Sequence, residues 1–130
     1  MVKQSVAMVI NYQDHVLLGL KDPQLSDSLA GKWHIPAGTK KLGESDLETG
    51  IREGYEETTL IIHPTNNYLG RIITPKQTIL RFHEFTTRNG NPQAGSDLID
   101  LKWVMRTDIY KHLQEQLYES WPQQLHEYFR

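Results

Sequence analysis

The sequence contains no cysteine, which excludes disulfide bonds, thiolate metal sites and cysteine nucleophiles. The absence fits a reducing compartment, and we expect a cytoplasmic protein. The sequence also lacks any apolar run approaching the ~20 residues of a membrane-spanning helix. Its first residues lack the apolar core of a signal peptide. We therefore expect a protein without a membrane partner.

An excess of charge of one sign is missing too. The chain carries 14 basic and 16 acidic residues, for a formal net charge of -2. A protein that binds duplex nucleic acid carries a basic surplus, so the balance argues against duplex nucleic acid as a partner. The length of 130 residues predicts a single domain over residues 1–130 that buries its own core. Monomer and homodimer both remain open.

Short apolar segments predict the strands. Residues 5–10 and 15–20 flank a polar turn and predict a β-hairpin. Further strands are expected over residues 32–38, where Pro36 and Gly38 break the segment, and over residues 68–74, 78–87 and 101–105. Because these strands alternate with helical segments, we predict an α/β fold in which a mixed β-sheet is sandwiched between α-helices.

Two segments predict helices. Ser45 followed by Glu48 forms a capping box, the sequence signature of a helix start. The buried face of this helix is expected to carry Leu47, Ile51, Gly54, Tyr55 and Thr58, with the glutamates on the other side. A second helix is expected from Asp108, with an apolar stripe of Ile109, Leu113, Leu117 and Trp121, until Pro122 interrupts it.

The stretch "GIREGYEETTL", residues 50–60, combines acidic side chains with glycine. Glu53, Glu56 and Glu57 lie close together on a helix, where like charges repel by a few tenths of a kcal/mol per pair, about 0.2–0.5. Each interior glycine costs about 1 kcal/mol relative to alanine. A divalent cation would offset the repulsion, because Mg²⁺ and Mn²⁺ prefer carboxylate oxygen. The alternative is a solvated acidic face of the helix.

The spacing around this stretch carries more information. Gly38 is followed after five residues by Glu44, and after seven more by Arg52-Glu53; Glu56-Glu57 and Leu60 follow. This arrangement resembles the Nudix hydrolase box, G-x5-E-x7-R-E-U-x-E-E-x-G-U, where U is a bulky aliphatic residue. Two positions depart from it, Gly54 for an aliphatic residue and Thr59 for glycine. The segments "GKWHIPAG" and "LKWVM" resemble the beginning and end of the family's domain, so the resemblance spans most of the chain.

The resemblance implies a metal-dependent hydrolase that acts on a nucleoside diphosphate linked to another group. Glu53, Glu56 and Glu57 match the family's metal-binding positions, and Mg²⁺ is the expected cofactor, with Mn²⁺ as the alternative. Glu44 matches an outer carboxylate that reaches the metal through water. Arg52 matches the arginine that orients a glutamate; its alternative is a surface ion pair with Glu56 or Glu48.

The general base is expected to be Glu53 or an aspartate in the loop before the late strand. Asp97 is the preferred candidate, because Asp100 is expected to lie within the strand itself. For both aspartates the alternative is a structural role in the turn. Gly38 is expected to admit phosphates or metal close to the backbone. Trp33 is expected to stack on a base, and the alternative is a position in the core. Lys41 is expected to bind phosphate, and the alternative is a solvated loop.

The substrate is the least constrained expectation. The short chain is similar to MutT-like (d)NTP pyrophosphohydrolases, which release nucleoside monophosphate and pyrophosphate. Pro75 lies near the position where ADP-ribose hydrolases of the family carry a proline, so ADP-ribose, nucleoside diphosphate sugars or dinucleotides are the alternative. The second alternative is a nucleotide-binding regulatory module without catalysis, although all four box carboxylates are present.

Overall fold

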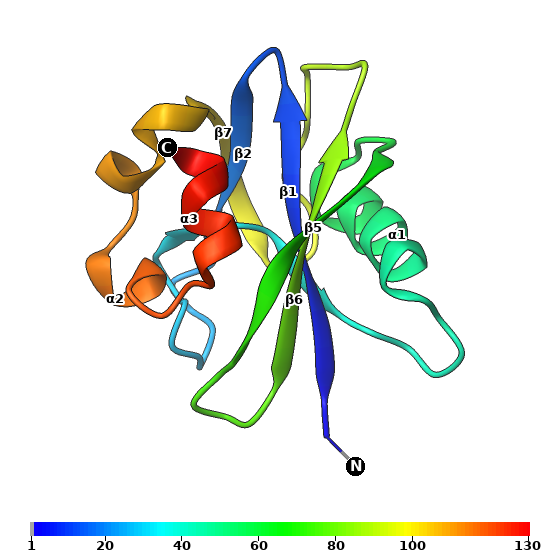
Figure 1. Cartoon of the computed structure of the whole chain (residues 1–130), viewed down its shortest axis with the longest axis vertical. Coiled ribbons are helices and arrows are strands. Elements are labelled where there is room, and N and C mark those ends of the chain that lie inside the picture. The colour runs from blue at the N-terminus through cyan, green and yellow to red at the C-terminus, as the bar shows by residue number, and fades with distance from the viewer. Residues whose placement is uncertain (1) are drawn as a thin grey trace.

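The computed structural model describes residues 2–130 and consists of a β-sheet with helices on both sides (Figure 1). In chain order the elements are β1 (Gln4–Tyr12), β2 (His15–Lys21), β3 (Trp33–His34), β4 (Ala37–Thr39), α1 (Asp46–Thr58), β5 (His63–Ile73), β6 (Ile79–Thr86), β7 (Leu98–Met105), the 3₁₀ helix η1 (Arg106–His112), α2 (Glu115–Tyr118) and α3 (Gln123–Phe129).

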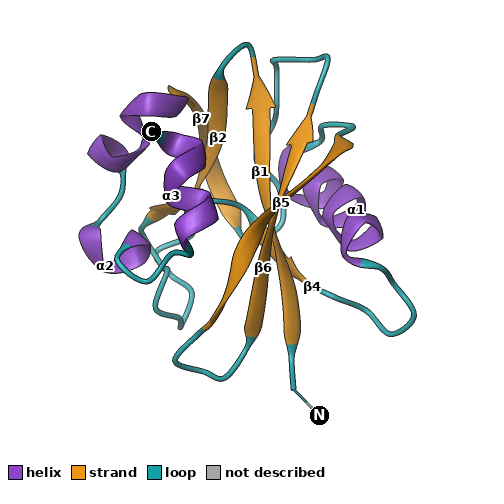
Figure 2. Cartoon of the chain, in the orientation of Figure 1, coloured by secondary structure: helices purple, strands orange, loops and turns teal. Residues whose placement is uncertain are grey.

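The strands form one mixed sheet of seven strands. Its main order is β3-β2-β1-β6-β5, with β4 paired to β1 and β7 paired to β2. Helix α1 lies on one side of the sheet, and η1, α2 and α3 lie on the other (Figure 2). The predicted α/β fold, with a mixed sheet between helices, is confirmed. The hairpin of β1 and β2 is confirmed as well, with Tyr12 paired to His15.

Strand β1 supplies both layers of the core. Because side chains alternate along a strand, Ala7 and Val9 pack towards the C-terminal helices. Val6, Met8 and Ile10 face the opposite way, towards α1. All five side chains are buried, as expected for a central strand covered on both faces.

The sheet divides beside β1, and this division creates room for a site. Strand β1 pairs with β2 only near the hairpin turn, where Asn11 meets Val16 and Tyr12 meets His15. Towards its beginning, β1 pairs instead with β4, with Val6 opposite Gly38. Strand β2 meanwhile continues alongside β3 and β7. The two halves of the sheet separate, and cavities form where they part.

The predicted buried face of α1 is wrong in part. Tyr55 is 57% exposed and Ile51 is also exposed, whereas Glu57 is buried. The buried face instead follows Gly50, Gly54 and Glu57, which lie on consecutive turns. The two glycines carry no side chain, so the helix backbone lies close against the sheet, and the large side chains of Ile51 and Tyr55 point outward.

The continuous C-terminal helix predicted from Asp108 is wrong too. Leu113 has an extended backbone, with φ -120 and ψ 150, and separates η1 from α2. Pro122 is the N-cap of α3, so the predicted interruption at that residue is confirmed. The short pieces fold around Tyr110, whose hydroxyl lies 2.6 Å from Nδ1 of His126. Tertiary contacts, rather than helical propensity, decide this region.

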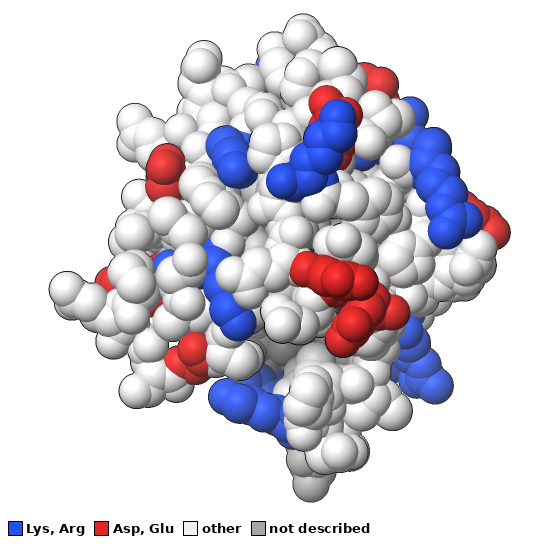
Figure 3. All heavy atoms as spheres, turned by 90° about the vertical axis from the view of Figure 1, so that its left-hand side faces the viewer, with Lys and Arg blue, Asp and Glu red and all other residues white. Residues whose placement is uncertain are grey.

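Two surface features bear on partners. Within residues 2–130, no helix is both long enough and apolar enough to cross a membrane. On the face shown in Figure 3, Lys and Arg side chains are scattered among Asp and Glu side chains, and the coloured residues there form no continuous basic surface. The exclusion of duplex nucleic acid stays a prediction.

Candidate active site

Helix α1 positions the acidic residues, and both of its ends are capped. At its start the Ser45 hydroxyl accepts a hydrogen bond from the Glu48 N–H at 3.1 Å, and Glu48 Oε1 accepts from the Ser45 N–H at 2.8 Å. The predicted capping box is therefore confirmed. At its end Thr59 adopts the left-handed conformation, with φ 62, where the Nudix pattern has glycine. The Thr59 N–H still donates to the Tyr55 carbonyl, at 2.9 Å.

Arg52 binds the carboxylates around it in a fork. Its Nε and Nη2 donate to the two oxygens of Glu44 at 2.7 and 2.9 Å. Its Nη1 donates to Glu53 Oε1 at 2.9 Å and lies 3.3 Å from Glu56 Oε2. Nη2 also donates to the Thr39 carbonyl at 3.0 Å. Arg52 therefore restrains Glu53 and also makes the alternative ion pair with Glu56, so its orienting role in catalysis stays a prediction.

Glu44 anchors this arginine and does not line the cavity described below. The Arg52 guanidinium, chiefly, lowers the pKa of Glu44 to about 2, so the carboxylate is charged throughout the physiological range. Glu44 Oε1 also accepts from the Lys41 N–H at 2.9 Å and from the Thr49 hydroxyl at 3.0 Å. Lys41 therefore contributes its backbone here, while its residue as a whole is exposed and lies outside the cavity. The outer-ligand role of Glu44 and the phosphate role of Lys41 stay predictions.

Glu57 is an acidic residue in a buried position. It is 5% exposed, and its Oε2 has no hydrogen-bond partner among the described residues. Burial, followed by the charges of Glu53 and Asp97, raises the pKa of Glu57 to about 8. Burial also raises the pKa of Glu53. A buried carboxylate without a partner is costly, so its presence needs a functional explanation.

A polar cavity of about 660 Å³ opens beside these residues, where the sheet divides. The acidic groups of its wall come from Glu53, Glu56, Glu57, Asp97 and Asp27, and the basic groups from Lys3, Lys21 and Lys76. Lys21 is ion-paired with Asp27, at 2.5 Å. Gly38 lines it as well, and a Cβ at that position would collide with the side chain of Glu53. The glycine thus gives Glu53 room to reach the cavity.

Of the two aspartates and Trp33, Asp97 alone lines the polar cavity. Asp97 lines the cavity in the loop just before β7, whereas Asp100 lies within β7 and is exposed. Trp33 does not line the polar cavity: it packs against the core, with Lys102 Nζ 4.2 Å from its ring centroid. Geometry therefore favours Asp97 over Asp100, and base stacking by Trp33 stays a prediction.

Sequence reasoning missed several residues of the cavity wall. Lys3 precedes β1, and Thr74 and Lys76 lie in the turn between β5 and β6, on either side of Pro75, which the sequence analysis did single out. The polar sequence "TPKQT" between two strands indicates a hairpin, but only the parallel pairing of β1 with β6 brings its tip to the acidic residues. His34, also on the wall, carries no distinctive spacing in the sequence.

The donor set fits a hard divalent cation. Glu53, Glu56 and Glu57 offer carboxylate oxygens on one wall, and Oε2 of Glu57 has no hydrogen-bond partner among the described residues. Across residues 2–130, no three acidic or histidine side chains already converge with metal-binding geometry. Nη1 of Arg52 instead contacts both Glu53 and Glu56, at 2.9 and 3.3 Å. The residues fit the expected ion, although the choice of Mg²⁺ or Mn²⁺ stays a prediction.

Comparison with known proteins gives a consistent result. The sequence matches the NUDIX domain family over residues 1–126. No curated protein sequence matches it. The fold is similar to the crystal structure of a NUDIX hydrolase from Nitrosomonas europaea, at 16% identity and TM-score 0.79, with 98% of this chain and 70% of that chain covered.

Two further structures are similar. One is the MutT protein from Methanosarcina mazei Go1, at 23% identity and TM-score 0.71, with 98% and 90% of the chains covered. The other is the NUDIX domain of Shewanella oneidensis NrtR complexed with ADP-ribose, at 19% identity and TM-score 0.71, with 98% and 88% covered. At these identities, the structural likeness supports the fold.

The chain belongs to the NUDIX domain family. It is accordingly a hydrolase that acts on pyrophosphate bonds, as the motif over residues 38–60 led us to expect.

Proposed function

We propose that this protein is a MutT-like pyrophosphohydrolase that converts a (deoxy)nucleoside triphosphate into the monophosphate and pyrophosphate. The observation that carries the proposal is the polar cavity, in which the glutamates of α1 lie together with Lys3, Lys21 and Lys76. A polyphosphate needs both kinds of group, because lysines pair with its outer oxygens while carboxylates hold the cation between protein and phosphate. We also propose that the protein acts in the cytoplasm.

Each acidic residue has a proposed role. Glu53, Glu56 and Glu57 would hold Mg²⁺ or Mn²⁺, which when bound offsets negative charge on the phosphates. A water molecule attacks phosphorus, a new P–O bond forms, the phosphoanhydride P–O bond breaks, and a carboxylate takes the proton of the water. Asp97 and Glu53 are the two candidates for that carboxylate. Arg52 keeps Glu53 in position through the hydrogen bond of 2.9 Å.

A second candidate substrate is ADP-ribose or a related nucleoside diphosphate compound. The observation that favours it is Pro75, which stands near the position where ADP-ribose hydrolases of the family carry a proline. In fold, the chain is as similar to the NUDIX domain of S. oneidensis NrtR, in complex with ADP-ribose, as to the M. mazei MutT protein, with TM-score 0.71 for each. Pro75 also lines the polar cavity. A nucleotide-binding module without catalysis ranks third, because this chain keeps the glutamates of the box.

The test is a panel of nucleoside triphosphates, ADP-ribose, nucleoside diphosphate sugars and dinucleoside polyphosphates, each with Mg²⁺ and with Mn²⁺. We expect nucleoside monophosphate and pyrophosphate from a triphosphate, and no turnover in excess chelator. Glu56→Gln is the matched control for a contaminating hydrolase. Preferred cleavage of ADP-ribose would replace the first candidate by the second, and binding without cleavage of any compound would support the third.

A further inference from the structure

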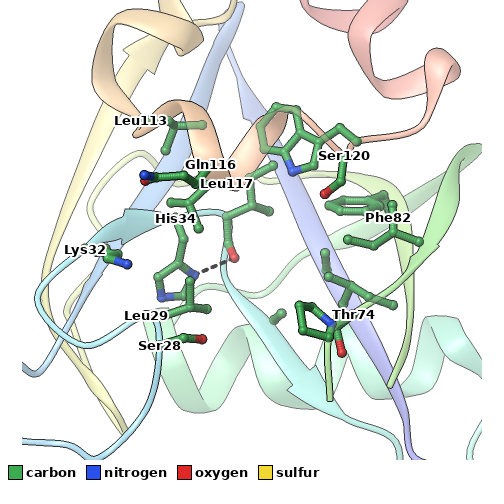
Figure 4. Close-up of a pocket in the computed structure, with 17 residues that line it drawn as sticks. Ser28, Leu29, Lys32, His34, Thr74, Phe82, Leu113, Gln116, Leu117 and Ser120 are labelled. Atoms are coloured by element: carbon green, nitrogen blue, oxygen red, sulfur yellow. Dashed lines mark hydrogen bonds between the residues drawn. The ribbon is translucent and has the colours of Figure 1, made fainter. Parts of the chain in front are cut away.

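The two faces of the sheet are covered to different extents. On one face, the C-terminal segments border a cavity of about 320 Å³, with Leu113 and Leu117 on one wall and Phe82 of β6 on another (Figure 4). On the other face, α1 is the only helix among residues 2–130 (Figure 2). It packs chiefly over β1 and β4 and only lightly over β6. The outer strands β6 and β5 are therefore left largely uncovered on the α1 side.

Four side chains occupy this uncovered part of the sheet. Tyr68 of β5 pairs with His83 of β6, and Arg71 pairs with Arg81. Paired residues project to the same side of a sheet, and so do residues two apart on one strand, so all four share a face. It is the α1 side, because Nε2 of His83 lies 2.9 Å from Asp46 in the first turn of α1. We call Tyr68, Arg71, Arg81 and His83 the open sheet face.

The open sheet face carries positive charge that the chain itself does not balance. Two arginines directly opposite each other on neighbouring strands repel. Nη1 of Arg81 donates to Gln4 Oε1 at 2.6 Å and lies 3.8 Å from Asp46 Oδ1. Asp46 is already shared with Lys40, whose Nζ lies 3.1 Å away. Arg71 is exposed and takes part in no ion pair among residues 2–130. This face therefore suits an acidic partner.

The outward side of α1 has the complementary character. Ile51 is 40% exposed and Tyr55 is 57% exposed, one helical turn apart. Glu48 lies one turn before Ile51 and uses Oε1 for the capping box, which leaves its other carboxylate oxygen for a partner. The helix thus presents two apolar side chains beside an acid. The open sheet face presents an aromatic ring, Tyr68, which is 43% exposed, beside the arginines.

The dimensions of the two surfaces also agree. Two neighbouring strands span about 10 Å, and an α-helix with its side chains is about 10–12 Å across. The 13 residues of α1 extend over roughly 20 Å. The 8 residues of β6 extend over roughly 26 Å. One helix of the length of α1 therefore covers the part of the sheet that α1 itself leaves open.

We propose that this protein forms a two-fold homodimer in which α1 of each copy covers the open sheet face of the other. The two-fold axis makes the contact reciprocal, so Glu48 of each copy meets Arg71 of the other, and Ile51 packs on Tyr68. The two α1 helices then lie side by side between two sheets, which buries both faces of each sheet. Glu53 and Glu57 project to the opposite side of α1, so the polar cavity stays open and the dimer does not depend on the proposed function.

The first experiment reverses a charge on the open sheet face. Sedimentation over about 1–100 µM, the range in which associations of moderate affinity dissociate, compares the mass in solution with the 15.1 kDa of one chain. Arg71→Glu places an acid opposite Arg81, which is favourable within a copy, and opposite Glu48 of the other copy, which is unfavourable. The Kd of the dimer should rise at least about tenfold. The melting temperature of the dilute, monomeric protein should not fall.

Two controls accompany this variant. Lys111→Glu makes the same kind of change on η1, on the other side of the sheet, and Lys111 is exposed. Its dimer should have the Kd of the parent. The double variant Arg71→Glu with Glu48→Arg restores an unlike pair between the copies and should recover part of the association. No recovery would overturn the pairing of Glu48 with Arg71.

The second experiment tests the apolar part of the contact. Ile51→Glu introduces a charge where the dimer excludes water, so its Kd should also rise at least about tenfold. Ile99→Glu is the matched control, because Ile99 is 54% exposed on β7, which pairs with β2 and lies away from β5. Circular dichroism should be the same for all variants, since each change is made at a surface position.

Two results would overturn the proposal. A parent that stays monomeric at about 100 µM would leave the open sheet face to a different, acidic partner. A dimer whose Kd is unchanged in Arg71→Glu or in Ile51→Glu would place the interface elsewhere on the chain. Neither result bears on the hydrolysis of nucleotides, so the proposed function is tested separately.

Discussion

The N–H of Gly95 donates a hydrogen bond to the carbonyl of Glu57, at 3.0 Å. The N–H of Gln93 donates a hydrogen bond to the carbonyl of Thr58, at 2.9 Å. The last carbonyls of a helix lack partners within the helix, so the loop before β7 caps the end of α1. Asp97 follows in the same loop and lines the cavity with Glu57. One short segment thus ties a candidate base to a candidate metal ligand.

Gly95→Ala should disturb this connection. A Cβ at this position would lie 2.6 Å from the backbone carbonyl oxygen of Glu56, which cannot rotate away. The loop should lift, lose both capping bonds and displace Asp97, lowering the free energy of unfolding by roughly 1–3 kcal/mol and reducing kcat. Thermal unfolding and steady-state kinetics measure both effects. Ala94→Ser, at the exposed neighbour, is the control. Parent-like kcat in Gly95→Ala would show that the loop does not position Asp97.

The two glycines of α1 should respond differently to alanine. A Cβ at Gly50 would collide with the ring of Phe85, which is fully buried. A Cβ at Gly54 would lie 2.6 Å from Cδ1 of Ile62, the end of a flexible side chain. We expect Gly50→Ala to lower the free energy of unfolding by roughly 1–3 kcal/mol. Gly54→Ala should cost less, because Ile62 can turn and the helix regains about 1 kcal/mol of propensity.

Chemical denaturation of both glycine variants in metal-free buffer makes this comparison. If Gly50→Ala proves more stable than the parent, α1 does not pack as closely on Phe85 as the structure indicates.

Glu57 predicts an unusual pH dependence of stability. Burial raises its pKa to about 8 from the ordinary value of 4.5, so the folded state holds a proton that the unfolded state releases. The resulting stabilisation is fully present below pH 4.5 and is lost as the pH rises to about 8. In Glu57→Gln no proton can be lost there. The melting temperature of the variant relative to the parent, in chelator, should therefore increase from pH 5 to about pH 8.5. A constant difference would contradict the assignment of Glu57 as buried and partner-free.

Much of this fold could be predicted from local sequence. The pair Ser45 and Glu48 predicted the start of α1, and the apolar runs around residues 11–14 predicted the hairpin of β1 and β2. The spacing from Gly38 to Leu60 predicted both the acidic set and the family. Such signals are readable because each depends on residues that are close in the chain.

The errors arose where distant contacts decide. Large apolar residues normally mark the buried face of a helix, but here Gly50 and Gly54 allow close packing, and Ile51 and Tyr55 point outward. Burial of Glu57 follows from that rotation. The placement of Lys76 required the parallel pairing of β1 with β6, which no local pattern indicates.

The central claim is that the glutamates of α1 form the catalytic metal site, and it is tested most directly by Glu56→Gln and Glu57→Gln. The measurement pairs the melting temperature in chelator with kcat at saturating Mg²⁺, on the best substrate of the parent. We predict melting temperatures equal to or above that of the parent. Glu56→Gln removes a like charge beside Glu53, and Glu57→Gln replaces a buried carboxyl, whose pKa burial raises to about 8, by a neutral amide. We also predict a loss of at least about 100-fold in kcat for each variant. If both variants retain near-parent kcat, the acidic face is merely solvated, and the account of the site is wrong.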